Sequence, residues 1–268
     1  MDSDSDFYGD EETVSALEAR VASFDVHNPY ETCPSARQLT ESIPAFLARL
    51  PPATTDWRPG LDWIWIANPF HPPARAPLLA QFRKGGAERL ALFAQFEKMT
   101  TTAAGGRGGG GAAKAQRDVA AERREAVADL KALAGACHVV TGKWMLFPEP
   151  GQVNEVWGKV ARATAEGGLG TVAKVETRIE SGKARLVCVY TRDFRDKEDV
   201  ARVLGRMREL ELVRPEGRQI YYKSDAWTEL GIYGGNEWGI GASMYSSNEI
   251  FGYIKMLASG SHDMLRES

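Results

Sequence analysis

The sequence has few of the residues, and none of the motifs, from which disulfide frameworks, metal sites and hydrolytic active sites are usually built. Its 268 residues include only three cysteines, Cys33, Cys137 and Cys188, and four isolated histidines. Cysteines so few and so far apart predict neither a disulfide framework nor a zinc site, and they favour a reducing compartment. The chain also lacks H-E-x-x-H, paired-Cys and G-x-S-x-G motifs. We therefore expect no metal, no cofactor and no catalytic activity.

Long hydrophobic runs and a basic leader are missing as well. No apolar stretch approaches the ~18 residues that a membrane span requires. The N-terminus is acidic, where a signal or transit peptide would be basic. The sequence thus predicts no membrane contact and a location in the cytoplasm, with the nucleus as the alternative.

Charge is nearly balanced overall but unevenly distributed. The chain has 33 Lys and Arg against 36 Asp and Glu, a net charge of −3. Residues 1–12 contain six acids and no base, so the remainder of the chain carries a net charge of +3. A block of like charge cannot bury enough apolar surface to offset the entropy lost on ordering. This predicts an acidic, largely disordered tail over residues 1–35.

Hydrophobic periodicity divides the rest of the chain into short helices and strands. Ser42 and Asp196 are predicted N-caps of two helices. The segments 171–175 and 184–190 form the clearest predicted hairpin, with a Ser-Gly turn between them. Further helices are expected at 78–99 (two short helices broken at Gly85-Gly86), 116–133, 153–166 and 249–257. Further strands are expected at 61–66, 138–147, 219–223, 230–233 and 238–240.

A hairpin among strands that are separated by single helices predicts an α+β fold. We expect a curved, mainly antiparallel sheet with helices packed on one face, which leaves the other face free to bind a ligand. One domain is expected over residues 36–245, with a flexible Gly-rich insertion at 100–115. The insertion is not a phosphate loop, because Lys114 does not follow the last Gly directly and no Ser or Thr follows it. Residues 246–268 are expected to form a C-terminal segment with a short amphipathic helix.

A basic hairpin is the most informative local feature. A nucleotide binder without sequence readout needs flat rings to stack a base and cations to hold phosphate. The candidate cations on and around the predicted hairpin are Lys174, Arg178, Lys183 and Arg185. Glu176 and Glu180 weaken the local field, so a solvated hairpin of mixed charge is the alternative interpretation.

Three of the seven tryptophans have an ordinary structural interpretation. Trp63 and Trp65 share one face of a predicted strand, where core packing is the default expectation. Trp157 lies on the inward face of an amphipathic helix and is a predicted core residue.

Three blocks of sequence resemble a known family. They are TGKWMLFPEPGQVNEVWGKVARATAEGGLGTVAKV, LVCVYTRDFRD and YYKSDAWTELGIYGGNEW, and the resemblance runs from about Ala36 to Tyr245. The chain is similar to the basophilic-leukemia-expressed protein family, which has no established function. That family resembles in fold the cap-binding translation initiation factor 4E, which implies a curved antiparallel sheet backed by three main helices.

The resemblance to the initiation factor implies roles for particular residues. Arg178 falls at the position of a phosphate-binding Arg, and Lys183 or Arg185 matches a second cation loosely. Tyr190 takes the place of a Trp near the phosphates. Only Phe70 or His71 is placed for the first of the two rings that sandwich a cap, and residues 129–140 contain no aromatic for the second. The resemblance thus implies RNA or nucleotide binding rather than recognition of a methylated cap.

Two functions remain in competition. The first is a non-catalytic RNA- or nucleotide-binding protein, with Lys174, Arg178, Lys183 and Arg185 on phosphate and with Trp57, Phe70 and Tyr190 as stacking candidates. The second is a protein-interaction module that docks a partner on its helical face or on the apolar segment 250–257. An enzyme acting on a nucleotide would need paired carboxylates, for which the sequence offers no convincing candidate. Ligand, partner and oligomeric state cannot be predicted from these patterns.

Overall fold

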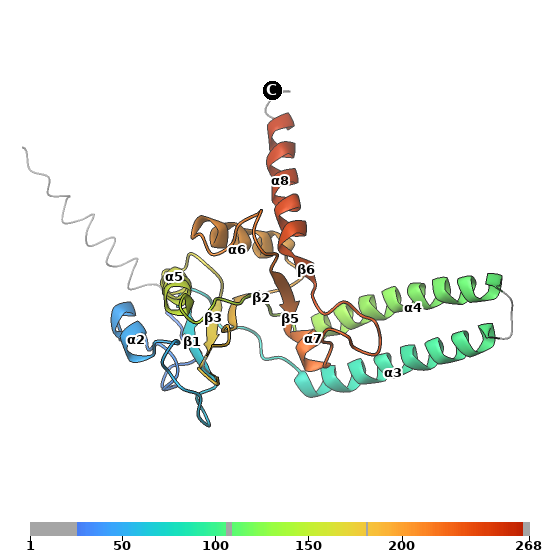
Figure 1. Ribbon diagram of the computed structural model, residues 1–268, viewed down its shortest axis with the longest axis horizontal. Helices are drawn as coiled ribbons and strands as arrows, with labels where there is room; N and C mark the ends of the chain where they lie inside the picture. Colours follow the sequence, from blue (N-terminus) through green and yellow to red (C-terminus); the bar gives the residue numbers. More distant parts are fainter. Residues whose placement is uncertain (1–25, 106–108, 181, 265–268) are drawn as a thin grey trace, which may run out of the picture.

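The computed structural model describes residues 26–105, 109–180 and 182–264. Together they form one six-stranded antiparallel sheet, in the order β1-β3-β4-β2-β5-β6, and seven helices (Figure 1). The strands are β1 (Trp63–Ala67), β2 (Gly142–Leu146), β3 (Val172–Glu176), β4 (Val187–Thr191), β5 (Tyr221–Ser224) and β6 (Tyr245–Ser246). The helices are α2 (Ile43–Arg49), α3 (Leu79–Ala104), α4 (Gly109–Ala136), α5 (Val153–Ala165), α6 (Lys197–Glu209), α7 (Asp225–Glu229) and α8 (Ser247–Met264).

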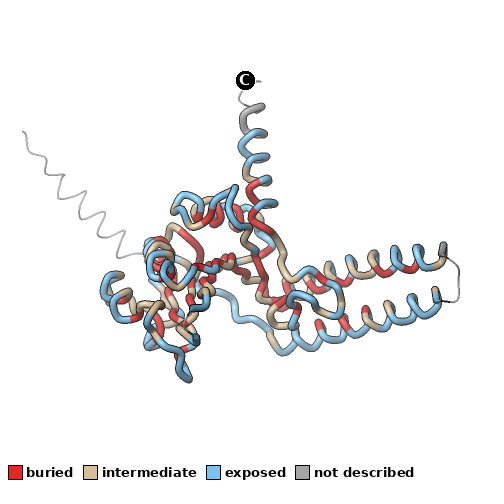
Figure 2. The backbone as a smooth tube through the Cα atoms, viewed as in Figure 1, coloured by how far each residue is buried: buried red, intermediate tan, exposed pale blue. Residues whose placement is uncertain are grey.

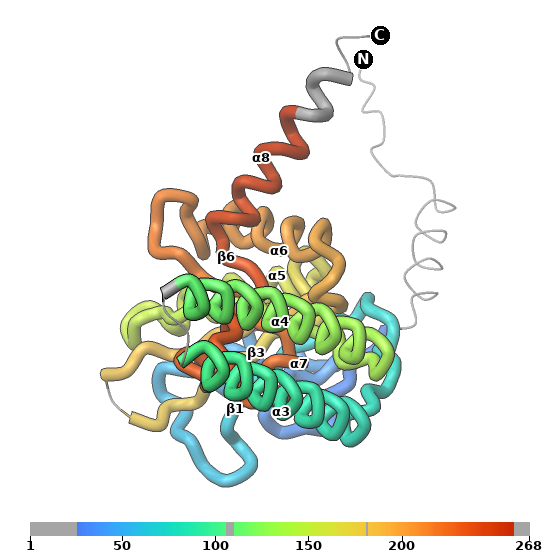
Figure 3. The backbone as a smooth tube through the Cα atoms, turned by 90° about the vertical axis from the view of Figure 1, so that its right-hand side faces the viewer, coloured from blue at the N-terminus to red at the C-terminus, as the bar shows by residue number. Residues whose placement is uncertain are grey.

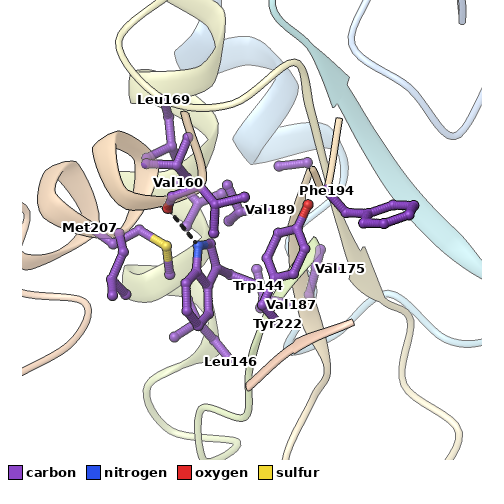
Figure 4. Close-up of a cluster of buried hydrophobic side chains, with 14 of the residues drawn as sticks. Trp144, Leu146, Val160, Leu169, Val175, Val187, Val189, Phe194, Met207 and Tyr222 are labelled. Carbon is purple, nitrogen blue, oxygen red and sulfur yellow. Dashed lines mark hydrogen bonds between the residues drawn. The ribbon is translucent and has the colours of Figure 1, made fainter. Parts of the chain in front are cut away.

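The main core lies between one face of the sheet and the helices α5 and α6. Alternate residues of the central strands are buried there, among them Trp144, Val175 and Val189 (Figure 4). The indole Nε1 of Trp144 donates a hydrogen bond to the carbonyl of Val200 on α6, 3.1 Å away. Trp157 of α5 is fully buried, as its helical spacing predicts. The predicted class, an α+β fold with helices on one face of an antiparallel sheet, is confirmed, whereas likeness to the initiation factor stays a prediction.

Local sequence signals positioned several elements correctly. The hydroxyl of Ser42 accepts a hydrogen bond from the Ala45 amide, and the Asp196 carboxylate accepts one from the Asp199 amide, so both predicted N-caps are confirmed. Strands β3 and β4 pair antiparallel as the predicted hairpin. Gly170 precedes β3 where a Cβ would lie 2.0 Å from a carbonyl oxygen of β4, so only glycine fits that approach.

The long helical hairpin α3–α4 differs from the sequence prediction. Helix α3 runs through Gly85 and Gly86 without a break, so the prediction of two short helices is wrong. A Cβ on Gly86 would lie 2.5 Å from Leu230, and the glycine therefore makes room for a side chain from a distant part of the chain. The predicted flexible insertion is also largely helical, since α3 extends to Ala104 and α4 begins at Gly109; residues 106–108 lie outside the described ranges. The hairpin projects from the sheet with buried residues along its inner seam and exposed ones elsewhere (Figure 2).

Two short segments predicted as strands are turns. Residues 230–233 follow α7 directly, and residues 238–240 belong to the loop that returns to β6. Ile232 and Ile240 are buried, which explains the strand-like pattern. The side-chain amide of Asn236 fixes this loop, because it donates to the carbonyl of Ile240 and accepts from its N–H.

Both ends of the described chain are more ordered than expected. Residues 1–25 lie outside the described ranges, but residues 26–35 of the predicted disordered tail form turns, and Tyr30 stacks on Trp65 of β1 with 4.7 Å between ring centroids. Helix α8 is longer than predicted and extends away from the sheet beside α6 (Figure 3). Ile250 and Phe251 are buried in the main core, so these two residues of the apolar segment 250–257 are not available to dock a partner. No described helix combines the length and hydrophobicity that crossing a bilayer requires.

Candidate functional site

The sheet face that points away from α5 and α6 carries polar and aromatic side chains. Because side chains alternate along a strand, the residues between the core positions all point to this second face. We call it the lysine face; it is formed by Trp63 and Trp65 of β1, Lys174 and Glu176 of β3, Cys188 and Tyr190 of β4, Lys143 and Met145 of β2, and Tyr221 and Lys223 of β5.

Lys174 lies against the two tryptophans of β1. The register places it opposite Trp65, and its Nζ is 3.8 Å from a ring centroid of Trp63 and 4.8 Å from that of Trp65. Contacts of this kind stabilise a cation by about 0.5–2 kcal/mol. Burial is the main cause of the lowered pKa of Lys174, and the neighbouring charge of Lys143 lowers that pKa further. The tryptophans thus form a platform for a cation instead of packing between sheet and helices.

Lys143 is held by the first residue of α7. Its Nζ forms an ion pair with Asp225 and lies 3.2 Å from the hydroxyl of Thr228. The hydroxyl of Thr141 donates to the other carboxylate oxygen of Asp225. Lys143 is therefore a buried cation whose charge is compensated within the protein.

Lys223 has no such compensation. It is directly opposite Lys143 in the register of β2 and β5, only 6% of it is exposed, and its Nζ lies 3.6 Å from the ring centroid of Tyr233. Like charges directly opposite on one face of a sheet are destabilising. Burial, and after it the charge of Lys143, lowers the pKa of Lys223 to about 8, although Asp225 opposes the shift. Among the residues that the structure describes, neither Lys223 nor Lys174 forms an ion pair.

A cavity of about 630 Å³ opens over these lysines. This volume lies within the range of about 300–1,000 Å³ that is typical of small-molecule sites. Its walls combine the three lysines and Glu176 with the rings of Trp63, Tyr221 and Tyr233. One oxygen of Glu176 accepts a hydrogen bond from the backbone N–H of Leu186. The cavity thus offers ammonium groups on its floor and partly exposed aromatic rings at its sides.

Tyr190 separates this cavity from a smaller one of about 340 Å³. The ring centroid of Tyr190 lies 5.6 Å from the Nζ of Lys143 and 5.7 Å from that of Lys174, and Tyr190 also lines the smaller cavity. Burial raises the pKa of the Tyr190 hydroxyl, which therefore stays neutral. Arg192 and Asp225 contribute opposite charges to the smaller cavity.

A family model matches residues 7–231, which is most of the chain, and its description is basophilic leukemia-expressed protein Bles03. The chain belongs to the Bles03 family. The match contains all three lysines of the face, and the description names no reaction. Within the described residues, no three His, Cys, Asp or Glu side chains are arranged to hold a metal ion. Burial raises the pKa of Cys188, in the middle of the face, to about 11, so that its thiol is a poor nucleophile near neutral pH.

The candidate cations from the sequence do not all come together. Lys174 lies in the cavity, but Arg178 forms an ion pair with Asp56 at 2.7 Å and Lys183 pairs with Glu180 at 2.6 Å. Arg185 is buried, and its Nη1 donates to the carbonyl of Lys183. Three of the four predicted phosphate-binding residues therefore contact protein groups outside the cavity and do not line it.

The stacking candidates are also dispersed. Tyr190 lies on the lysine face beside two lysines. The exposed indole of Trp57 donates from its Nε1 to Asp62, and Phe70 lies against Gly167, where an added Cβ would approach its ring to 2.9 Å. Neither Trp57 nor Phe70 lines the cavity over the lysines.

Sequence reasoning missed Lys143 and Lys223, the two cations that complete the site. Each lies within a predicted strand next to an aromatic residue that points to the core, Trp144 and Tyr222 respectively. A lysine at such an alternate position must point to the opposite face of the sheet. That signal was present in the sequence and could have added both residues to the candidates.

Proposed function

We propose that this chain is a non-catalytic RNA- or nucleotide-binding protein that holds phosphate on the lysine face. The observation that carries the proposal is the pair of lysines, the half-buried Lys174 and the buried Lys223, which line one cavity without forming an ion pair in the described part of the chain. A buried ammonium group without an anion costs free energy, and a bound phosphate removes that cost.

The aromatic rings beside the lysines favour a nucleotide over an inorganic anion as the ligand of the cavity. Tyr221 is 46% exposed and Tyr233 is 55% exposed, although both line the cavity. Stacking of a base on such a ring contributes about 1–3 kcal/mol. Tyr30 and Trp65 stack directly on each other, which leaves no space for a base between them. We therefore place base stacking at Tyr221 and Tyr233 and do not propose a cap sandwich.

Binding of nucleic acid and nucleotides to a double variant tests the proposal. Lys174→Gln with Lys223→Gln removes two cations from the cavity, and Arg178→Gln with Lys183→Gln removes two from the hairpin as a matched control. We expect the first variant to lose at least tenfold in affinity for a random RNA pool or a nucleoside triphosphate. For RNA, the slope of log affinity against log salt should fall by about 1.4, at about 0.7 per phosphate contact on a single strand.

The control variant decides between the two basic regions. It should bind as the wild type does, because its two cations already form ion pairs with Asp56 and Glu180. The proposal is wrong if the wild type binds neither RNA nor nucleotide, or if the cavity variant binds both as tightly as the wild type.

An exposed stripe on α3 favours protein docking as a second candidate function. Leu92, Phe96 and Met99 follow i, i+4, i+7 spacing and are 60%, 38% and 64% exposed. Such a stripe fits an amphipathic helix of a partner, which would complete a three-helix packing with α3 and α4. A Leu92→Glu, Met99→Glu variant that captures the same proteins as the wild type, from lysate treated with RNase, would exclude this candidate.

A further inference from the structure

The uncompensated positive charge of the lysine face is concentrated in one place. Lys174 and Lys223 point into the same cavity, and Lys143 lies between their strands with its charge offset by Asp225. The basic residues that could extend the site along the hairpin are engaged elsewhere, Arg178 by Asp56 and Lys183 by Glu180.

We propose that the cavity binds the terminal di- or triphosphate of a nucleotide or of an RNA 5′ end, and that Lys223 takes up a proton when this group binds. The inference rests on the proposed function and specifies which part of the ligand occupies the lysines. A free nucleotide and an RNA 5′ end present the same chemistry to the lysines, a compact and multiply charged phosphate group.

The placement of the lysines favours a compact anion over an extended backbone. Proteins that follow a single strand use cations spread along a groove, because the strand presents one charge per nucleotide. Here Lys143 and Lys223 are direct cross-strand neighbours, and Lys174 is two strands from Lys143 in the same sheet. All three line the same cavity, so a compact group of several phosphates can contact more than one of them, whereas the phosphates of an extended strand are spaced along the chain.

The two lysines without an ion pair favour an anion with at least two charges. Besides the three lysines, the acidic groups at the site are Asp225, which pairs with Lys143, and Glu176, whose charge raises the pKa of Lys174 but which forms no ion pair with a described lysine. An internal phosphodiester of RNA carries one charge and would compensate only one of the two lysines that form no ion pair. Because the other lysine would stay uncompensated, RNA without a terminal di- or triphosphate should bind more weakly than RNA that carries one.

Proton uptake follows from the surroundings of Lys223. The groups that face it are Lys143 from β2, Asp225 and Thr228 from α7, Tyr233 from the following loop, and Lys174 from β3 across the cavity. In the free protein the pKa of Lys223 is about 8, so part of the population is neutral at that pH. A phosphate beside it favours the ammonium form and raises its pKa, so binding draws a proton from solution.

Isothermal titration calorimetry in two buffers of different ionisation enthalpy measures this uptake. We expect an uptake of about half a proton per triphosphate bound at pH 8. At pH 6.5 Lys223 is already charged, so we expect no uptake and only a release from the terminal phosphate, whose second pKa is about 6. Affinity should fall about tenfold from pH 7 to pH 9, because only about a tenth of the free protein then carries the charged lysine. The ligands are pyrophosphate, a nucleoside triphosphate, the matching monophosphate, and one RNA decamer with either a 5′-hydroxyl or a 5′-triphosphate.

The pattern across ligands separates the inference from the function on which it rests. The inference is supported if the triphosphate forms bind at least tenfold more tightly than the monophosphate and the 5′-hydroxyl RNA. Whichever of the free nucleotide and the 5′-triphosphate RNA binds with the higher affinity identifies the source of the phosphate group. Equal binding of 5′-hydroxyl and 5′-triphosphate RNA would overturn the inference and leave the proposed function standing. If no RNA or nucleotide binds, both are wrong.

Three variants test the assignment to Lys223. Lys223→Arg keeps the positive charge at all accessible pH values, so it should bind triphosphate without proton uptake. Lys223→Gln should lose both affinity and uptake, and Lys183→Gln, whose charge is paired outside the cavity, should change neither. Proton uptake that persists in Lys223→Arg would overturn the assignment.

Discussion

Replacement of Lys223 by methionine should stabilise the free protein. The lysine is 6% exposed and directly opposite another lysine, and its ammonium group contacts a tyrosine ring but forms no ion pair among the described residues. Methionine has a similar length and no charge, so it can occupy the same space without the electrostatic cost. A change that removes the proposed anion contact would then increase the free energy of unfolding.

The magnitude follows from the pKa of Lys223. Its value falls from the ordinary 10.5 to about 8 in the folded protein. At 1.36 kcal/mol per pKa unit, the protonated lysine costs about 3 kcal/mol of folding free energy below pH 8. Loss of the contact with Tyr233 offsets about 0.5–2 kcal/mol of this. We therefore expect Lys223→Met to raise the free energy of unfolding by about 2 kcal/mol at pH 7.

The sign of the pH dependence provides a sharper test. Between pH 8 and pH 10.5 the unfolded chain binds more protons at this lysine than the folded protein does, so wild-type stability gains a contribution as pH rises. The cost of the charged lysine falls from about 3 kcal/mol at pH 7 to about 1 kcal/mol at pH 10. Because this titration is absent from the variant, the advantage of Lys223→Met should shrink by about 2 kcal/mol between pH 7 and pH 10.

Urea denaturation of wild type and variant at pH 7 and pH 10 measures both quantities. Lys183→Met serves as the control, because its side chain is 68% exposed and should change stability by less than about 0.5 kcal/mol. A Lys223→Met protein less stable than wild type at pH 7, or a stability difference that does not shrink by pH 10, would refute the reasoning.

Three further predictions concern the core and the face. Trp157→Phe should cost about 1 kcal/mol less than Trp144→Phe in urea denaturation. The buried Nε1 of Trp157 has no hydrogen-bond partner among the described residues, whereas that of Trp144 donates to a carbonyl of α6. Gly170→Ala should destabilise the protein by about 1–3 kcal/mol, visible as a lower melting temperature, because its Cβ would lie 2.0 Å from a carbonyl oxygen of β4. Cys188, with a pKa of about 11, should react with iodoacetamide at pH 7.5 at least tenfold more slowly than the half-buried Cys33, as followed by mass spectrometry.

Elements with strong local signals were predictable from the sequence. The β3–β4 hairpin follows from a turn between two apolar segments, and α6 follows from the Asp196 cap and a regular apolar stripe. The continuity of α3 through Gly86 was not predictable, because it depends on contact with Leu230, which is 144 residues away. Glycine lowers helix propensity locally, but tertiary packing outweighs that preference here.

The site was only half predictable for a related reason. Charges that are close in sequence do not reveal the carboxylates that the fold brings to them, and Asp56 neutralises Arg178 from 122 residues away. Alternation along a strand could identify the face of Lys143 and of Lys223, but not that β2 and β5 are neighbours. Lys143 and Lys223 lie opposite each other only because β2 and β5 are adjacent in the sheet, and local sequence patterns do not encode strand order.

The helical hairpin α3–α4 also has a consequence for how the chain folds and how its length can vary. The amide of Leu78 donates to the carbonyl of Cys137 at 2.8 Å, so the chain returns from the hairpin to the place where it left. The nearly sixty residues between these two therefore connect β1 to β2 as a short loop would. The two arms are consecutive in the chain and pack against each other, which favours early and fast formation. Whole helical turns could thus be added to or removed from both arms together while β1, β2 and the lysines of the sheet keep their places.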